Sequence, residues 1–177
     1  DIPATIKDAD VDKDLPKSKK LRLKIEGIRP KVQQAIHQQG VMSVKINNFE
    51  SFNKLVEACD FLVKLYESLS EWSKISYTMA HVAFSEINMT EFHSDIDKLK
   101  NKLNELSNFN DNYPILIELN TKILDTTPFI EQLEFLAFGK MQLRHWNLLF
   151  EACDRQNAYH NDITIEELMN LGILRAR

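Results

Sequence analysis

The sequence contains few of the residues that form tight turns, with four glycines and five prolines among 177 residues. Sandwiches, barrels and doubly wound sheets need many turns, in which glycine and proline dominate. Their scarcity argues against those folds and favours long helices. No apolar run approaches the ~18 residues that a membrane-spanning helix needs. The length suits one domain, with or without an arm.

The chain also lacks a net positive charge and has few cysteines. The formal net charge is -4 and the pI is about 5.8, whereas a nucleic-acid binder normally carries a basic field. Cys59 and Cys153 are too few for a disulfide framework, and both lie in apolar helical patterns. We therefore expect small buried thiols in a reducing compartment. Residues 1–4 lack the basic head and apolar core of a signal peptide, and the missing initial methionine indicates a fragment or processed chain.

The N-terminal residues 1–20 are polar and rich in aspartate and lysine, which predicts a flexible or loosely docked arm. Charged and apolar side chains then alternate over residues 20–26. A period of two puts Leu21, Leu23 and Ile25 on one face, and this pattern predicts a half-buried strand.

A short helix is expected next, because Pro30 suits a first helical turn and Gly40 suits a C-terminal cap. Residues 42–47 alternate again. Together these patterns predict a small strand–helix–strand or irregular piece over 21–48. The sequence leaves open whether this piece packs on the rest of the chain.

Apolar residues at heptad spacing begin after residue 49. A first stripe steps by 4, 3, 4 and 3 through Leu55, Cys59, Leu62, Tyr66 and Leu69. It predicts a long helix over about 50–78 that packs along a seam. Residues 77–87 break the period and are expected to form a connection.

The next helix is predicted to begin after Asn88, a capping residue followed three positions later by Glu91. Its stripe has the same spacing and consists of Phe92, Ile96, Leu99, Leu103 and Leu106. A polar turn at 107–112 is expected to end it.

Pro114 opens a third long helix, whose stripe begins with Leu116, Leu119 and Ile123. Pro128 interrupts this pattern: either it kinks one long helix, or Thr127 caps a new helix with Pro128 at its first position. The stride continues through Ile130, Leu133 and Ala137, which favours the kink.

Two short helices are predicted after residue 139. One spans about 140–152, and the other follows a capping box formed by Thr164 and Glu167 and ends near Gly172. The sequence as a whole predicts a mainly α fold in which 49–177 form an elongated antiparallel helical bundle.

No pattern in the chain indicates catalysis or a cofactor. A phosphate loop needs glycines before its lysine and a hydroxyl after it, but Gly139 and Lys140 are followed by Met141. His93 and Asp97 are one turn apart and could share a metal ion. A stronger explanation is that the acidic residues around them favour the dipole of a helix N-terminus, so we expect no metal site.

Arg144, His145 and Trp146 form a dense trio on a short helix. Trp146 lies one turn before Leu149 and Phe150, which predicts that its ring is buried as a core anchor flanked by hydrogen bonds. The other interpretation is a hot spot for a protein partner, because Trp and Arg dominate such sites.

Residues 141–149 and 163–173 resemble the dynein heavy chains, in which a helix bearing Arg-His-Trp precedes a similar capping box and a Leu-rich turn. Residues 66–72, 84–87 and 127–130 resemble family segments as well. The resemblance covers about 54–177. It departs from the family in a longer spacing between Pro128 and Arg144, where residues 138–140 replace an Asn-Pro-like segment.

The resemblance implies a segment at the junction of the tail and the linker, before the ring of AAA+ modules. Such a segment is non-catalytic, binds no cofactor and transmits ATP-driven linker movement. Its implied partners are the tail, the ring and dynein intermediate or light chains, with microtubules reached only through the parent motor and no nucleic acid or membrane. Residues 163–173 look more axonemal than cytoplasmic, which favours a ciliary, cytoskeletal location.

A free-standing, spectrin-like helical adaptor is the alternative to the dynein interpretation. It would bind partner helices through its seams. For either function, the residues expected to matter for structure or interaction are Pro128, Arg144, His145, Trp146, Leu149, Phe150, Thr164 and Glu167.

Overall fold

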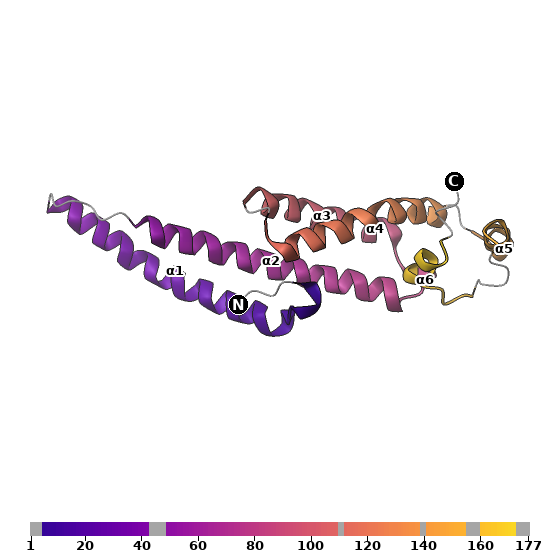
Figure 1. Cartoon of the computed structure of the whole chain (residues 1–177), viewed down its shortest axis with the longest axis horizontal. Coiled ribbons are helices and arrows are strands. Elements are labelled where there is room, and N and C mark those ends of the chain that lie inside the picture. The colour runs from indigo at the N-terminus through magenta and orange to yellow at the C-terminus, as the bar shows by residue number, and fades with distance from the viewer. Residues whose placement is uncertain (1–4, 43–48, 110–111, 139–140, 155–159, 173–177) are drawn as a thin grey trace.

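The computed structural model describes residues 5–42, 49–109, 112–138, 141–154 and 160–172, and within them the secondary structure is helical without a strand. The elements in chain order are η1 (Ile6–Asp8), α1 (Val11–Val41), α2 (Glu50–His81), η2 (Phe84–Glu86), α3 (Met89–Phe109), α4 (Pro114–Phe138), α5 (Leu143–Ala152) and α6 (Ile165–Asn170). The predicted mainly α, elongated architecture is confirmed (Figure 1).

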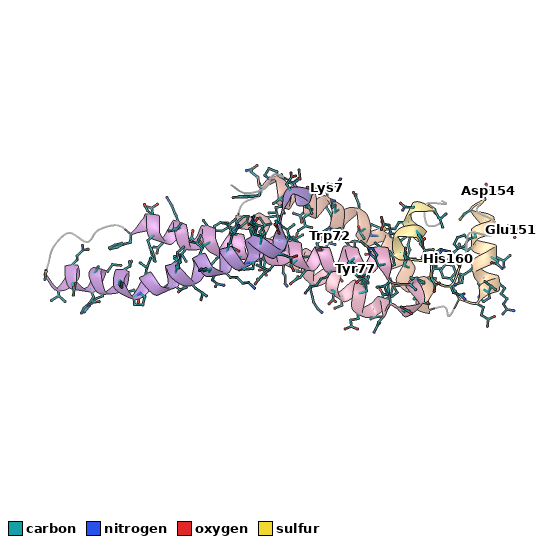
Figure 2. The ribbon with its side chains drawn as sticks, turned by 90° about the horizontal axis from the view of Figure 1, so that it is seen from below. Lys7, Trp72, Tyr77, Glu151, Asp154 and His160 are labelled. Atoms are coloured by element: carbon teal, nitrogen blue, oxygen red, sulfur yellow. The ribbon has the colours of Figure 1, made fainter. Side chains whose placement is uncertain are left out.

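α2 is the spine of the molecule. Its 32 residues span about 48 Å at 1.5 Å per residue. Its N-terminal half pairs with α1 in a long hairpin, and its C-terminal half packs against α3, which packs in turn on α4 (Figure 1). α5 and α6 lie at the end of the molecule opposite the tip of the hairpin. Figure 2 shows Trp72 in the middle of the molecule, and Glu151 and Asp154 at its α5 end.

Two heptad seams run along α2. The seam that faces the bundle consists of Phe61, Leu65, Ser68, Trp72, Ile75 and Met79, all of them buried. Cys59, Val63 and Tyr66 are buried on a different side of the helix. Tyr66 lies near Asp14 of α1, and burial together with that carboxylate raises the pKa of its phenol. This second side therefore faces α1.

The stripe predicted for α2 is wrong in part, because it follows the side nearer α1. Leu55 at its start is 49% exposed, since only α1 is available to cover α2 near the hairpin tip. The predicted stripe of α3 is confirmed, as all five of its residues are buried. Leu116, Leu119 and Ile123 of α4 are also buried as predicted.

The strand predicted over 20–26 is wrong, because these residues lie inside α1. Ile25 is 5% exposed, whereas Leu23 is 72% exposed, so the alternating pattern does not produce a buried face. Lys, Arg, Glu and Leu are good helix formers, and no neighbouring strand is present in the described residues. The second predicted strand falls largely on 43–48, which lie outside the described residues.

The helix predicted to begin at Pro30 is also part of α1, which contains Pro16 and Pro30. Residues 11–20, assigned above to an arm, form the first turns of the same helix. Asp10 caps it by accepting a hydrogen bond from the Lys13 amide at 3.2 Å. Leu15 packs against the main core, so this part of the chain has a fixed place on the bundle.

The hairpin of α1 and α2 is held by a thin seam. Lys19 Nζ lies 2.8 Å from Glu67 Oε1, and Arg22 Nε lies 2.7 Å from Asp60 Oδ1. The side chains of these two pairs are 36–50% exposed. Ion pairs with this exposure contribute about 0–1 kcal/mol each. Burial of Ile25 against α2 therefore supplies much of the attraction in this part of the molecule.

Pro128 lies inside α4 and does not start a new helix. The interpretation of Thr127 as a helix cap is therefore wrong, and the continuous helix is confirmed. The side chains of Thr126 and Thr127 instead bond back to the carbonyls of Lys122 and Ile123, at 2.7 and 2.8 Å. Such bonds satisfy the hydroxyls of buried threonines within the helix.

Leu99→Ala is expected to destabilise the bundle by about 2–5 kcal/mol, because it leaves a cavity at a fully buried position. Leu23→Ala, at a 72% exposed position, is expected to change stability by less than about 0.5 kcal/mol. Urea unfolding followed by circular dichroism measures both. Equal losses in the two variants would contradict the assignment of the core to α2, α3 and α4.

Cys59 is expected to react at least about tenfold more slowly than Cys153 with a thiol-specific disulfide reagent at pH 8. Cys59 is buried, and Cys153 is partly exposed. Burial, with a smaller effect of the Asp60 carboxylate, raises the pKa of the Cys59 thiol and lowers its thiolate fraction. A Cys153→Ala variant isolates the slow phase. Equally fast reaction of both thiols would show that the hairpin is open.

Candidate interaction site around Trp146

Trp146 is the centre of an aromatic cluster at the α5 end of the bundle. Its side chain is 4% exposed. Its ring meets Phe84 edge-on, with centroids 5.8 Å apart and planes at 86°, and Phe150 at 6.3 Å and 60°. Edge-to-face aromatic pairs contribute about 0.5–1.5 kcal/mol beyond the burial of their area. The predicted burial of Trp146 is therefore confirmed. Phe150 is 1% exposed, and Leu149 is partly buried against the same core.

The backbone fixes Phe84 in this cluster. Its amide donates to the carbonyl of Ile163 at 2.8 Å, and Ala83 forms an isolated antiparallel bridge with Thr164. The connection between α2 and α3 is thereby attached to the segment before α6. Three stretches that are far apart in the sequence thus meet at one corner of the fold.

α6 begins with the predicted capping box. The Glu167 amide donates to Thr164 Oγ1 at 3.2 Å, and the Thr164 amide donates to Glu167 Oε2 at 2.9 Å. Both bonds satisfy amides that a helix start otherwise leaves unpaired. The cap sets the direction of α6 and places Ile165 and Leu168 in the core, where each is at most 1% exposed.

Arg144 and His145 lie on the outer side of α5. The Gln142 amide lies 3.1 Å from His145 Nδ1, and Arg144 Nε lies 3.2 Å from His145 Nε2. A neutral imidazole has one unprotonated nitrogen, so His145 accepts one of these two bonds at a time. Arg144 is exposed, and its side chain contacts His145 of the same helix.

A pocket of about 290 Å³ lies beside the Trp146 ring. Its walls are Phe84, Ser85, Ile87, Leu136, Ala137, Met141, Trp146, Asn161 and Ile163. None of these side chains is ionisable near neutral pH, so the part of the lining that the structure describes offers no pair of groups for acid–base chemistry. Its lining combines apolar side chains with the polar side chains of Ser85 and Asn161.

The structure brings most of the predicted residues together at this corner, but not Pro128. That residue lies eight positions, or about 12 Å of helix, before Leu136 of the pocket wall, and it is exposed. Sequence reasoning missed Phe84 and Ile163. The sequence signal that could have identified Phe84 is an aromatic residue within the predicted connection between two helices.

His93 joins α3 to α4. Its Nδ1 lies 2.5 Å from Glu134 Oε2, and its Nε2 lies 3.7 Å from Asp97 Oδ2. Among the residues that the structure describes, no three His, Cys, Asp or Glu side chains are grouped so that they could hold a metal ion. The described helices also include none long and apolar enough to cross a membrane.

Trp146→Ala is expected to cost about 3–5 kcal/mol of unfolding free energy, as for other buried aromatic truncations. Chemical unfolding measures it, and Arg144→Ala is the control, with a change below about 0.5 kcal/mol. An unchanged stability in the tryptophan variant would mean that the ring is exposed and free for a partner.

Comparison with protein families matches residues 52–177 to the family model described as dynein heavy chain, N-terminal region 2. No match was found among curated proteins or among solved structures. The matched residues begin within the first turn of α2, and α1 lies outside them. They include the whole corner where Trp146, Phe84 and Ile163 meet, called here the Trp146 corner. The chain belongs to the dynein heavy chain family, with residues 52–177 in its N-terminal region 2.

Proposed function

We propose that this chain is a non-catalytic mechanical segment of a microtubule motor, at the junction of the tail and the linker. It transmits linker movement that ATP turnover in the parent chain drives. The observation that carries the proposal is the continuity of α2, which runs without a break from the hairpin into the bundle. Displacement of either part therefore passes to the other along one helix.

The packing of α2 supports this role. A helix satisfies its backbone hydrogen bonds internally, and a close-packed seam resists sliding. The ion pair between Lys102 Nζ and Glu71 Oε1, at 2.6 Å, adds a link between α3 and α2. Pro128 and the connection at 82–88 are the positions where we expect bending.

The Trp146 corner has a supporting part in this proposal. It attaches α5 and α6 to the connection that follows α2, through Phe84 and Ile163. A load applied at the C-terminal end of the segment would therefore reach the end of α2 through these contacts as well as through α3 and α4.

The parent chain, in this proposal, is an axonemal dynein heavy chain with a ring of AAA+ ATPase modules. The segment contacts the tail, the ring and intermediate or light chains, and it meets microtubules only through the parent motor. Support for the axonemal assignment comes from the resemblance of residues 163–173.

Helix-weakening substitutions in α2 test force transmission. Ser73→Gly with Lys74→Gly changes two exposed positions and weakens the helix by about 1 kcal/mol per residue. In the parent motor we expect slower microtubule gliding, by severalfold, with unchanged basal ATP hydrolysis. The measurement is a gliding assay beside a steady-state ATPase assay.

The matched control is Ser73→Ala with Lys74→Ala. It removes the same two polar side chains, but alanine has a high helix propensity, so the helix is not weakened. It is expected to glide at the wild-type speed. Wild-type gliding of the glycine variant would contradict transmission through α2. A parallel loss of ATPase activity would indicate damage to the motor and not to the lever.

A further inference from the structure

The outer side of α4 carries an exposed apolar stripe. Ile117, Leu124 and Phe135 are 51%, 59% and 80% exposed, and Pro128 is exposed as well. At 100° per residue these four positions fall within about 40° of one another. The stripe is about 27 Å long, since Phe135 lies 18 positions after Ile117 and each position adds 1.5 Å.

The stripe lies opposite the buried side of the same helix. Leu119, Ile130 and Leu133 are at most 1% exposed and point about 180° away from it at helical spacing. A helix that is apolar on two opposite sides is normally covered on both. Within the described residues, α3 and η1 pack on α4, and neither covers the stripe.

The charges beside the stripe are acidic. Asp125 and Glu131 flank it and are exposed, and neither forms an ion pair within the part of the chain that the structure describes. The one lysine of the described part of α4, Lys122, lies farther round the helix and is paired with Glu118 at 3.4 Å. A covering element with basic flanks would therefore be complementary.

The backbone adds an acceptor at the middle of the stripe. Pro128 has no amide hydrogen, so it cannot donate to the carbonyl of Leu124 as an ordinary residue four positions later would. The stripe therefore combines apolar side chains, two carboxylates beside them and the carbonyl of Leu124, which receives no hydrogen bond from residue 128.

From these features we propose that the α4 stripe, defined by Ile117, Leu124, Pro128 and Phe135, docks an amphipathic helix from outside these 177 residues. That helix carries apolar residues at heptad spacing and Lys or Arg on its flanks, the usual chemistry of a helix-to-helix seam. The proposal does not depend on the assignment to the tail–linker junction.

The test uses the 177-residue chain and a labelled synthetic helical peptide of about three heptads, with leucine along its seam and lysine on both flanks. A second peptide carries glutamate in place of the lysines. Fluorescence anisotropy at low salt is expected to show at least about tenfold tighter binding of the lysine peptide. The preference should shrink at about 0.3 M salt, where charges are screened.

Leu124→Gln with Phe135→Gln is expected to weaken binding of the lysine peptide at least tenfold, because it removes the apolar centre of the contact. Leu23→Gln on α1, also an exposed leucine, is the matched control and should bind normally. Asp125→Lys with Glu131→Lys should reverse the preference between the two peptides.

The proposal would be overturned by equal binding of both peptides, by binding of neither peptide, or by full binding of the lysine peptide to the glutamine variant. Sedimentation equilibrium of the chain alone tests a competing occupant. A dimer that dissociates in the glutamine variant would identify a second copy of this chain on the stripe and would also overturn the proposal.

Discussion

The fold depends on α2 burying two sides at once. Along its C-terminal part, the side with Leu65 and Trp72 forms the core with α3 and α4, whereas Cys59 and Val63 are covered on the side of α1. One helix therefore belongs to both the hairpin and the bundle. Any change in its direction has to disturb two seams, and the proposed role as a lever depends on that coupling.

Sequence reasoning worked best where a helix has one buried side. The buried stripes of α3 and of the first turns of α4 were predicted correctly, because a single heptad stripe identifies the face that packs. The predicted turn at 107–112 began too early, since α3 continues to Phe109. α2 was harder, since two apolar sides overlap in one pattern and the stripe through Leu55 and Leu62 lies beside the seam of the core. Residues 20–26 of α1 were mistaken for a strand because Leu21, Leu23 and Ile25 alternate with charged residues, although Ile25 alone of the three is buried.

The Trp146 corner was predictable only in part. The spacing of four between Trp146 and Phe150 indicates a shared buried face, and the capping box of α6 is a local signal. The contact of Trp146 with Phe84, and the bond from Phe84 to Ile163, join positions about 60 and 80 residues apart along the chain. Tertiary packing determines such pairs, and no local pattern in one sequence encodes them.

The central claim is that the hairpin and the bundle move as one body through α2. Pulsed electron-spin distance measurement tests it, with labels at the exposed positions Lys54 and Tyr77 and with Cys59 and Cys153 replaced by alanine. The account predicts one narrow distribution of the distance between the two labels, near the ~35 Å that 23 helical steps span. The distribution in the parent motor should be the same with and without ATP. A broad or two-peaked distribution would contradict a rigid lever.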